Sequence, residues 1–300
     1  MDTRMDLAAR QREAVEEELA RRTLIHQRRV ARLKHGAKRR AHMKNLPAAS
    51  KRLDVLAIGD SWFEYPLDGN TPSFSNTAIA AQLGHMGNPP PLILNYALHG
   101  QATTEVLSYE NQERIVSAVT DASQWLNGKP DAILVSMGGD DLVGDQFAIY
   151  LDYEGSGLNQ DRFDGALASV EASYKDLFAL RDAVAPGVPI IGHCYDYAIP
   201  NGAAPICAGP WLLPSLEFSG YDSTEGLGIV SAMIDRFAGR LGALAGKANN
   251  YLLVDTRNTL QRVAFAPDGW ANELHPYPAG FALLAQKFLA ALKKKFKGRI

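Results

Sequence analysis

Ser61 directly follows a short apolar run, Leu-Ala-Ile-Gly-Asp-Ser, at a point where a buried strand is expected to stop. A serine there either belongs to a turn or serves as a nucleophile at the rim of a sheet. Far along the chain, His275 precedes the last apolar helical stretch and is a candidate base. A hydroxyl, an imidazole and backbone donors near them are what acyl-transfer chemistry requires.

Five short segments rich in Val, Ile and Leu are expected to be the strands that position these residues. They span 53–58, 91–97, 131–137, 188–194 and 251–255. None alternates cleanly between apolar and polar residues, which is typical of a parallel sheet with both faces covered. Helical stretches are expected near 75–85, 111–126, 161–185, 226–249 and 278–295. This alternation predicts an α/β fold in which ligands bind at the carboxyl ends of the strands.

Four short motifs occur in order at those strand ends, and together they resemble the SGNH (GDSL-type) hydrolases, a family of serine esterases and lipases. The motifs are Gly59-Asp60-Ser61, Gly100, Gly138-Gly139-Asp140-Asp141 and Asn272-Glu273-Leu274-His275-Pro276. The resemblance implies a three-layer α/β/α, flavodoxin-like fold with a five-stranded parallel sheet. It implies that Ser61 is the nucleophile and His275 the general base, with an oxyanion hole formed by Ser61, Gly100 and Asp140. The family needs no metal or cofactor, and we expect none here.

The expected third member of the triad departs from the family's Asp-x-x-His motif, because Asn272 stands in place of the aspartate. An Asn side chain accepts a hydrogen bond from the histidine but brings no charge to stabilise the imidazolium. Glu273 is the alternative carboxylate, and some enzymes resembling this family are thought to use only a Ser–His dyad. The sequence leaves Asn272 and Glu273 as equal candidates for orienting His275.

Asp140 is a second departure, because the family's Gly-x-Asn-Asp motif has an amide donor at this position. An ionised carboxylate repels a developing oxyanion and cannot donate to it, whereas a protonated one can donate. Burial and the neighbouring Asp141 favour the protonated form. The two substitutions leave a second hypothesis open, a catalytically weak or inactive SGNH-like domain that acts as a ligand-binding or interaction module.

Residues 195–226 are rich in Gly, Pro and aromatic side chains and are expected to form a long non-helical segment that shapes substrate choice. Trp62, His193 and Tyr195 are candidates for substrate contact, although His193 also suits a structural role. The expected substrate is an acyl or acetyl ester of a small molecule, a lipid or a glycan.

The first fifty residues differ from the remainder in charge. Residues 1–52 hold fifteen Lys and Arg against six Asp and Glu, in a chain whose net charge is −2. We expect a basic arm and linker over 1–50, with the linker at 45–50, and an SGNH hydrolase-like domain over 51–300. The arm is expected to be either a polar helix or, preferably, a partly disordered segment that is dispensable for folding.

The charge of this arm suits contact with an acidic surface, a membrane, a neighbouring chain or the acidic body of its own chain. The lack of aromatic residues among the basic ones disfavours nucleic acid. The chain has neither an apolar run of about 18 residues nor an apolar N-terminal stretch, and we therefore expect a cytoplasmic protein. Cys194 and Cys207 are close enough in sequence to pair, but a reduced state is expected there.

Overall fold

The computed structural model describes residues 2–42, 52–65, 78–203, 209–263 and 269–300. Within them, a central sheet has five strands, β1 (Asp54–Gly59), β2 (Leu92–Asn95), β3 (Ala132–Ser136), β4 (Ile190–His193) and β5 (Tyr251–Val254). All neighbouring strands are parallel, in the order β2-β1-β3-β4-β5. The predicted five-stranded parallel sheet is confirmed, and its strand order is the flavodoxin-like one.

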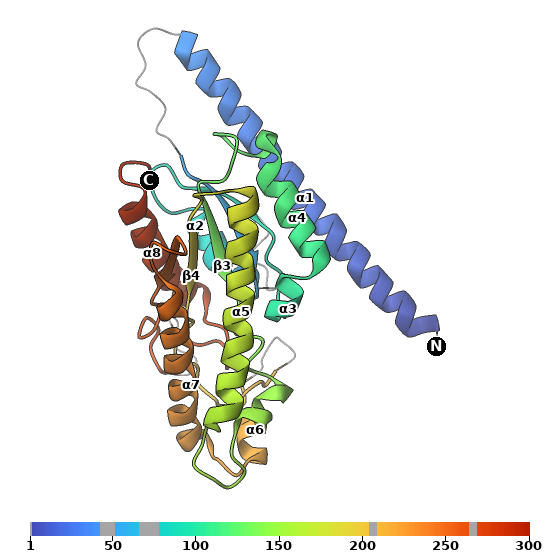
Figure 1. The fold of residues 1–300 in the computed structure, drawn as a ribbon, viewed down its shortest axis with the longest axis vertical. Coiled ribbons are helices and arrows are strands. Elements are labelled where there is room, and N and C mark those ends of the chain that lie inside the picture. Colours follow the sequence, from blue (N-terminus) through green and yellow to red (C-terminus); the bar gives the residue numbers. More distant parts are fainter. Residues whose placement is uncertain (1, 43–51, 66–77, 204–208, 264–268) are drawn as a thin grey trace.

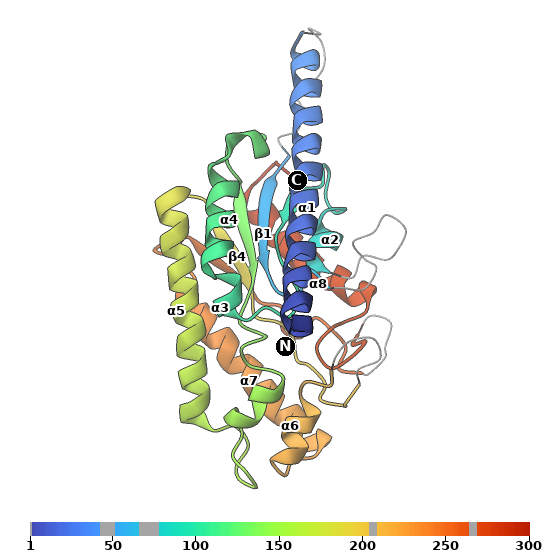
Figure 2. The same cartoon turned by 90° about the vertical axis from the view of Figure 1, so that its right-hand side faces the viewer.

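Helices cover both faces of this sheet (Figures 1 and 2). They are α2 (Ile79–Leu83), α3 (Thr103–Val106), α4 (Tyr109–Thr120), α5 (Gln160–Val184), α6 (Leu213–Phe218), α7 (Ser223–Leu244) and α8 (Pro278–Lys295), with short 3₁₀ turns η1 (Ala122–Gln124) and η2 (Asp145–Tyr150). Helices α2 and α8 pack against each other, whereas α5 packs against both α4 and α7. This arrangement is the expected three-layer α/β/α fold.

The central strands β1 and β3 are buried along their whole length, which explains their continuous apolar sequences. Their register pairs Ile58 with Val135 and Gly59 with Ser136. The polar residues that follow these two strands therefore begin at the same edge of the sheet.

The segment 195–226 corrects one expectation, because it is partly helical. Helix α6 lies within it, and α7 already begins at Ser223. The start of α7 is fixed by Asp222, whose side chain accepts hydrogen bonds from the backbone of Thr224 and Glu225. Glu225 bonds back to the Asp222 backbone, which completes a capping box.

The basic N-terminal segment forms one long helix, α1 (Asp2–His42), both ends of which project beyond the body (Figure 1). It contacts the edge strand β2 and η1. Leu19, His26 and Val30 are buried in this contact, so the segment is a docked helix and the preferred expectation of a partly disordered arm is wrong. The expected linker at 45–50 lies outside the described residues.

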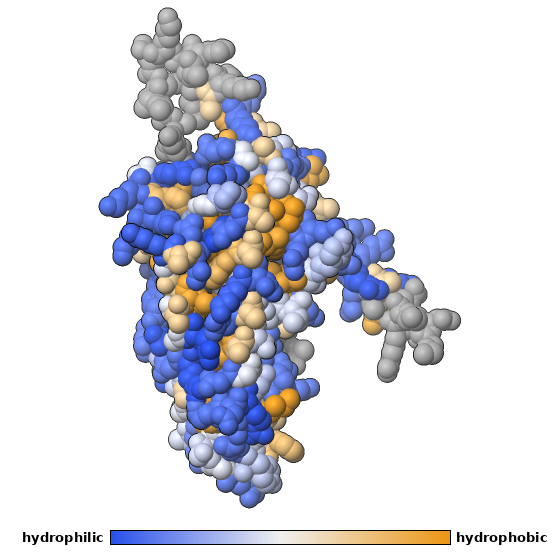
Figure 3. Space-filling model, in the orientation of Figure 1, coloured by the Kyte–Doolittle hydropathy of each residue, from blue (hydrophilic) through white to orange (hydrophobic). Residues whose placement is uncertain are grey.

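Helix α1 is mostly polar, and only a narrow strip of its surface is buried against the body. Figure 3 shows mostly hydrophilic side chains on the coloured part of α1 and over the visible face, with an apolar patch on its upper half. None of the described helices is long and apolar enough to cross a membrane. Cys194 is buried, and its expected relation to Cys207 stays a prediction because Cys207 lies outside the described residues.

Candidate active site

Ser61 and His275, 214 positions apart in the sequence, meet at the carboxyl edge of the sheet. The Ser61 hydroxyl oxygen lies 2.7 Å from Nε2 of His275. On the other side of the ring, Nδ1 lies 3.2 Å from the side-chain oxygen of Asn272. These contacts place the imidazole between a hydroxyl and an amide oxygen, as the sequence predicts for the Asn272 alternative.

The orientation of the Asn272 amide is fixed by its other contacts. Its oxygen also accepts hydrogen bonds from the backbone N–H groups of Leu274 (2.9 Å) and His275 (2.8 Å). Its nitrogen donates to the Tyr65 hydroxyl at 2.8 Å. The Asn272 oxygen therefore faces His275, so Nδ1 of His275 carries the hydrogen and Nε2 is the acceptor for Ser61.

Glu273 does not face His275. Its fully buried carboxylate accepts hydrogen bonds from four backbone N–H groups, those of Gly202, Trp211, Leu212 and Leu213, at 2.5 to 3.0 Å. Glu273 therefore fastens the segment after β4 to the histidine loop. Of the two candidates for orienting His275, only Asn272 contacts it.

Burial sets the protonation state of His275. The side chain is 5% exposed, and its ring stacks on Tyr65 with ring centres 4.0 Å apart, while Trp211 approaches it edge-on. Burial lowers the pKa of His275 to about 3, and His99 adds to the effect in the same direction. The imidazole is therefore neutral at pH 7 and able to accept a proton.

The turn that carries Ser61 depends on Gly59 and Asp60. Gly59 has a φ of +130°, and a Cβ there would overlap the carbonyl oxygen of Ser136 on β3. Asp60 then accepts a hydrogen bond at 3.0 Å from the backbone of Trp62, two residues on. These features turn the chain sharply at the end of β1 and hold Ser61 at the rim of the sheet.

Asp60 belongs to a buried polar chain beneath this turn. Its carboxylate accepts hydrogen bonds from the hydroxyls of Ser136 and Tyr195, and burial raises its pKa to about 6. The Ser136 hydroxyl lies 2.8 Å from Nε2 of His193, whose Nδ1 accepts from the Tyr195 backbone. The order His193–Ser136–Asp60 puts the serine in the middle, and Ser136 and His193 are both fully buried, so this chain is not a catalytic triad.

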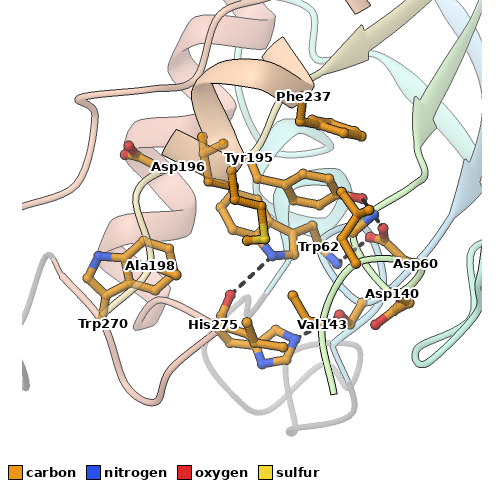
Figure 4. A pocket seen from close by; sticks show the side chains of 16 residues that line it. Asp60, Trp62, Asp140, Val143, Tyr195, Asp196, Ala198, Phe237, Trp270 and His275 are labelled. Carbon is orange, nitrogen blue, oxygen red and sulfur yellow. Dashed lines mark hydrogen bonds between the residues drawn. The ribbon is translucent and has the colours of Figure 1, made fainter. Parts of the chain in front are cut away.

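A pocket with about 530 Å³ of empty space, part of it open to solvent, lies beside Ser61 and His275 (Figure 4). Apolar side chains line most of it: Leu142, Val143, Ala198, Met233, Ile234, Phe237, Trp270 and Leu274. Asp60 and Asp140 lie together on one side of the pocket in Figure 4, and Asp196 lies on another. No Lys or Arg occurs among the described residues that line it.

The other residues singled out in the sequence divide between this pocket and its surroundings. Trp62 and Tyr195 line the pocket. His193 does not, because it lies behind Trp62, with the two rings stacked 5.3 Å apart, and burial lowers its pKa to about 3. Gly100 does not line it either, since it follows the edge strand β2 while the pocket opens toward β3 and β4.

Asp140 lies in a strongly perturbed environment on the pocket wall. One of its carboxylate oxygens is buried and has no hydrogen-bond partner in the described structure. Burial, and to a lesser degree the nearby carboxyl groups of Asp60 and Asp141, together raise the pKa of Asp140 to about 8. Asp141 points elsewhere and accepts two hydrogen bonds from Thr103 at the start of α3. Asp140 is therefore mostly protonated at pH 7.

Two features of this site give no signal in the sequence. Tyr65 contacts both His275 and Asn272, more than 200 positions away, and Trp211 covers the histidine from a segment expected only to border the substrate. Among the described residues, no three His, Cys, Asp or Glu side chains gather in a way that would hold a metal ion.

The fold of this chain is shared with solved lipases. A lipase from a goat rumen metagenome, Lip_vut3, matches with a TM-score of 0.53 and 18% identity, over 80% of this chain and 97% of that one. The extracellular lipase of Streptomyces rimosus matches with a TM-score of 0.51 and 16% identity, over 80% of this chain and 99% of that one. The chain has the SGNH-hydrolase fold. Neither a protein-family model nor a curated protein matches the sequence.

Proposed function

We propose that the protein is a serine ester hydrolase whose nucleophile is Ser61 and whose general base is His275. The observation that carries this proposal is the 2.7 Å contact between the Ser61 hydroxyl and the neutral His275 ring at the edge of a pocket. In the acylation step the Ser61 oxygen bonds to the ester carbonyl carbon while its proton moves to Nε2 of His275. The tetrahedral intermediate then expels the alcohol, which takes that proton, and water releases the acyl group by the reverse sequence.

Asn272 holds the tautomer that this mechanism requires, because its oxygen accepts the Nδ1 hydrogen of His275. It adds no charge, so the imidazolium formed in each step is less stabilised than beside a carboxylate. This observation is what favours the second candidate function, a weak or inactive domain that binds its ligand without rapid turnover.

The oxyanion is proposed to be bound by the backbone N–H of Ser61 and the protonated carboxyl of Asp140, which both line the pocket, and by the backbone N–H of Gly100. Gly100 lies outside the pocket lining, and its support is that the Leu98 N–H donates to the Gly59 carbonyl at 2.8 Å, which holds the Gly100 turn next to the Ser61 turn. Support for Asp140 comes from its place on the pocket wall, its unpartnered oxygen and its raised pKa. A protonated carboxyl can donate the hydrogen bond that the family's asparagine supplies. A protonated Asp140 would not repel the oxyanion at neutral pH, as an ionised aspartate would.

The substrate is proposed to be an ester with a small to medium apolar acyl group. The apolar lining accepts such a group, and the absence of Lys and Arg among the described lining residues disfavours an acyl group that carries a negative charge. The alcohol part of the ester, from a small molecule, a lipid or a glycan, is not specified by this pocket.

The proposal is tested with p-nitrophenyl acetate, butyrate and octanoate. Wild type and Ser169→Ala, which alters an exposed serine on α5, should turn over at equal rates, whereas Ser61→Ala and His275→Ala should lose activity by about 10³-fold or more. A fluorophosphonate should label Ser61, located by peptide mass spectrometry. Phosphonate labelling without turnover would favour the weak or inactive domain, and turnover that survives Ser61→Ala would contradict the proposal.

A further inference from the structure

The N-terminal helix reaches the candidate site through one side chain, Arg22. Its guanidinium is largely buried, with 14% of the side chain exposed. It donates to the backbone oxygens of Ala97 (3.0 Å) and Asn95 (3.4 Å), at the carboxyl end of β2. It also donates to the Glu64 carboxylate at 3.1 Å and to Glu18 of its own helix at 2.8 Å. Arg22 therefore ties α1 to the edge of the sheet that carries the site.

Glu64 is the centre of this arrangement. Its side chain is 9% exposed, and its second carboxylate oxygen accepts hydrogen bonds from His99, from Nδ1 at 2.9 Å and from the backbone N–H at 3.3 Å. The hydrogen bond with Glu64 raises the pKa of His99. We call Arg22, Glu64 and His99 the site clamp. A largely buried carboxylate is costly to leave unpaired, so the loss of the Arg22 charge should weaken the hold on Glu64.

The site clamp joins two turns that the proposed mechanism uses. Glu64 lies three residues after Ser61 and immediately before Tyr65, whose ring stacks on His275 and whose hydroxyl accepts from Asn272. His99 immediately precedes Gly100, the proposed oxyanion donor. One carboxylate thus links the turn of the nucleophile to the turn of the proposed oxyanion donor, and Arg22 of α1 places a positive charge against it.

We propose that Arg22 of α1 is a positioning residue for the ester-hydrolase site, a proposal that rests on the function proposed above. It acts through Glu64 to fix the Ser61 turn relative to Gly100. A second link between the same segments, from the Asn95 amide to the Phe63 carbonyl at 2.9 Å, does not involve α1. Loss of Arg22 therefore shifts the two turns without separating them.

Arg22 is not the only residue that docks α1 on the body. Leu19, His26 and Val30 bury their side chains against the body, and Glu16 forms an ion pair with Arg114 of α4. Within the described residues Arg114 makes no hydrogen bond to Arg22, Glu64 or His99, so Arg114→Ala removes a docking ion pair and leaves the site clamp intact. Arg21→Ala is a second control, because Arg21 is exposed and bonds to Glu18 within the helix.

The experiment compares Arg22→Ala with these two controls in the full chain. We expect Arg22→Ala to lower kcat for p-nitrophenyl butyrate by roughly 10- to 100-fold with KM changed less than about threefold, because misplacement of reacting groups by about 1 Å costs rates of this order. Arg21→Ala and Arg114→Ala should stay within about twofold of wild type. Arg22→Lys should recover part of the loss, and guanidinium at low millimolar concentration should raise the rate of Arg22→Ala but not of wild type.

Hydrogen–deuterium exchange provides a readout that needs no turnover. In Arg22→Ala, exchange should increase in the peptides covering 61–65 and 95–100 while it stays unchanged in the α1 residues around Val30, and neither control should show this pattern. Equal losses of kcat in Arg22→Ala and Arg114→Ala, or unchanged exchange at 61–65 and 95–100 in Arg22→Ala, would overturn the proposal. A wild type without Ser61-dependent turnover would refute the proposed function alone, and the exchange pattern would still decide whether Arg22 positions these turns.

Discussion

In the proposed mechanism, the protonation state of Asp140 determines whether the oxyanion meets a hydrogen-bond donor or a negative charge. Its pKa, raised to about 8 mainly by burial, lies well above the ordinary value of an aspartate. The protonated, donating form therefore predominates below about pH 8, and it is lost as the pH rises through that value. The same side chain would impair catalysis if it were exposed enough to ionise at pH 7.

The rate of ester hydrolysis should fall above about pH 8 in wild type, as Asp140 ionises. Asp140→Asn supplies an amide donor that does not titrate, so its profile should stay flat there and exceed wild type by up to about 10²-fold at high pH. The test is to measure kcat/KM as a function of pH for wild type, Asp140→Asn and Ser61→Ala. If the rate of Asp140→Asn falls above pH 8 in the same way as that of wild type, a group other than Asp140 causes the fall.

Asn272→Asp should increase activity, because a carboxylate would accept the Nδ1 hydrogen of His275 and stabilise the imidazolium. The Tyr65 hydroxyl, which accepts from Asn272, can instead donate to an aspartate. We expect kcat/KM at pH 7 to rise about tenfold, less than the roughly 10⁴ that an Asp→Asn change costs in a chymotrypsin-type triad, because Asn272 already holds the correct tautomer of His275. The nearby negative charge should also raise the pKa of His275 and move the acid limb of the profile upward.

The matched variant for this test is Asn272→Ala, which removes the hydrogen-bond acceptor without adding a charge. It should lower kcat/KM below wild type because the His275 tautomer is no longer fixed. A lower rate in Asn272→Asp with an unchanged melting temperature would mean that the buried site requires a neutral partner for His275.

At the residue scale, the sequence predicts contacts between residues of recognisable short motifs, but it does not predict the contacts that these residues make elsewhere. Ser61, His275 and Asn272 meet as expected because each follows a strand or precedes a helix at the same edge. No sequence pattern indicates that Glu273 bonds to the segment after β4, because its four hydrogen-bond donors there are backbone N–H groups. Burial of Ser136 and His193 in one polar chain likewise depends on the pairing of β3 with β4.

At the element scale, the close approach of β1 and β3 makes Gly59 irreplaceable. Gly59→Ala would place a methyl group onto the Ser136 carbonyl and force an alanine to a φ of +130°. We expect a loss of roughly 3 kcal/mol or more in the free energy of unfolding, with a melting temperature lower by about 10 °C. Gly165→Ala is the control, since Gly165 is exposed in α5 and a Cβ there meets nothing within 4 Å.

Gly165→Ala should stabilise the protein by about 0.5 to 1 kcal/mol, because alanine is the better residue in a helix. The two variants therefore shift the thermal unfolding curve in opposite directions. A Gly59→Ala variant with the melting temperature of wild type would show that β1 and β3 can separate at this point.

The elements themselves were predictable where burial is continuous along the sequence. The strands stand out because Val, Ile and Leu cover both faces, and the long helices because their residues are good helix formers. Helix α6 gave no signal, since it has six residues and a proline near its start. The docking of α1 was one of several open alternatives, because only three described side chains of a 41-residue helix are buried against the body.

At the scale of the whole molecule, burial shifts the pKa values of histidines and of carboxyl groups in opposite directions. Burial lowers the pKa of His26 to about 4 and that of His193 and His275 to about 3. It raises the pKa of Asp54 to about 7, in the α1 contact, where one oxygen lies 3.8 Å from Nε2 of His26. Asp60 and Asp140 are raised in the same way.

These shifts predict how stability depends on pH. These buried histidines have lowered pKa values, so their contribution is present above about 6.5 and is lost as the pH falls. The carboxyls have raised pKa values, so their contribution is present at low pH and is lost as the pH rises. The two effects oppose each other between about pH 4 and 6.5. Above about 6.5 the groups with raised pKa values still titrate, the carboxyls and His99, and stability should fall by roughly 1 kcal/mol per pH unit for each proton involved.

Thermal unfolding at several pH values between 6.5 and 8.5 measures this fall, and Asp54→Asn isolates one of its sources away from the catalytic residues. The variant keeps an oxygen to accept the hydrogen bond from the Leu126 backbone but cannot ionise. Its melting temperature should exceed that of wild type at pH 8 and approach it near pH 5, and the fall from pH 6.5 should be shallower. Asp176→Asn, an exposed change on α5, should keep the wild-type slope. If Asp54→Asn also keeps that slope, Asp54 does not change its protonation state in the folded protein over this range, and another group causes the fall.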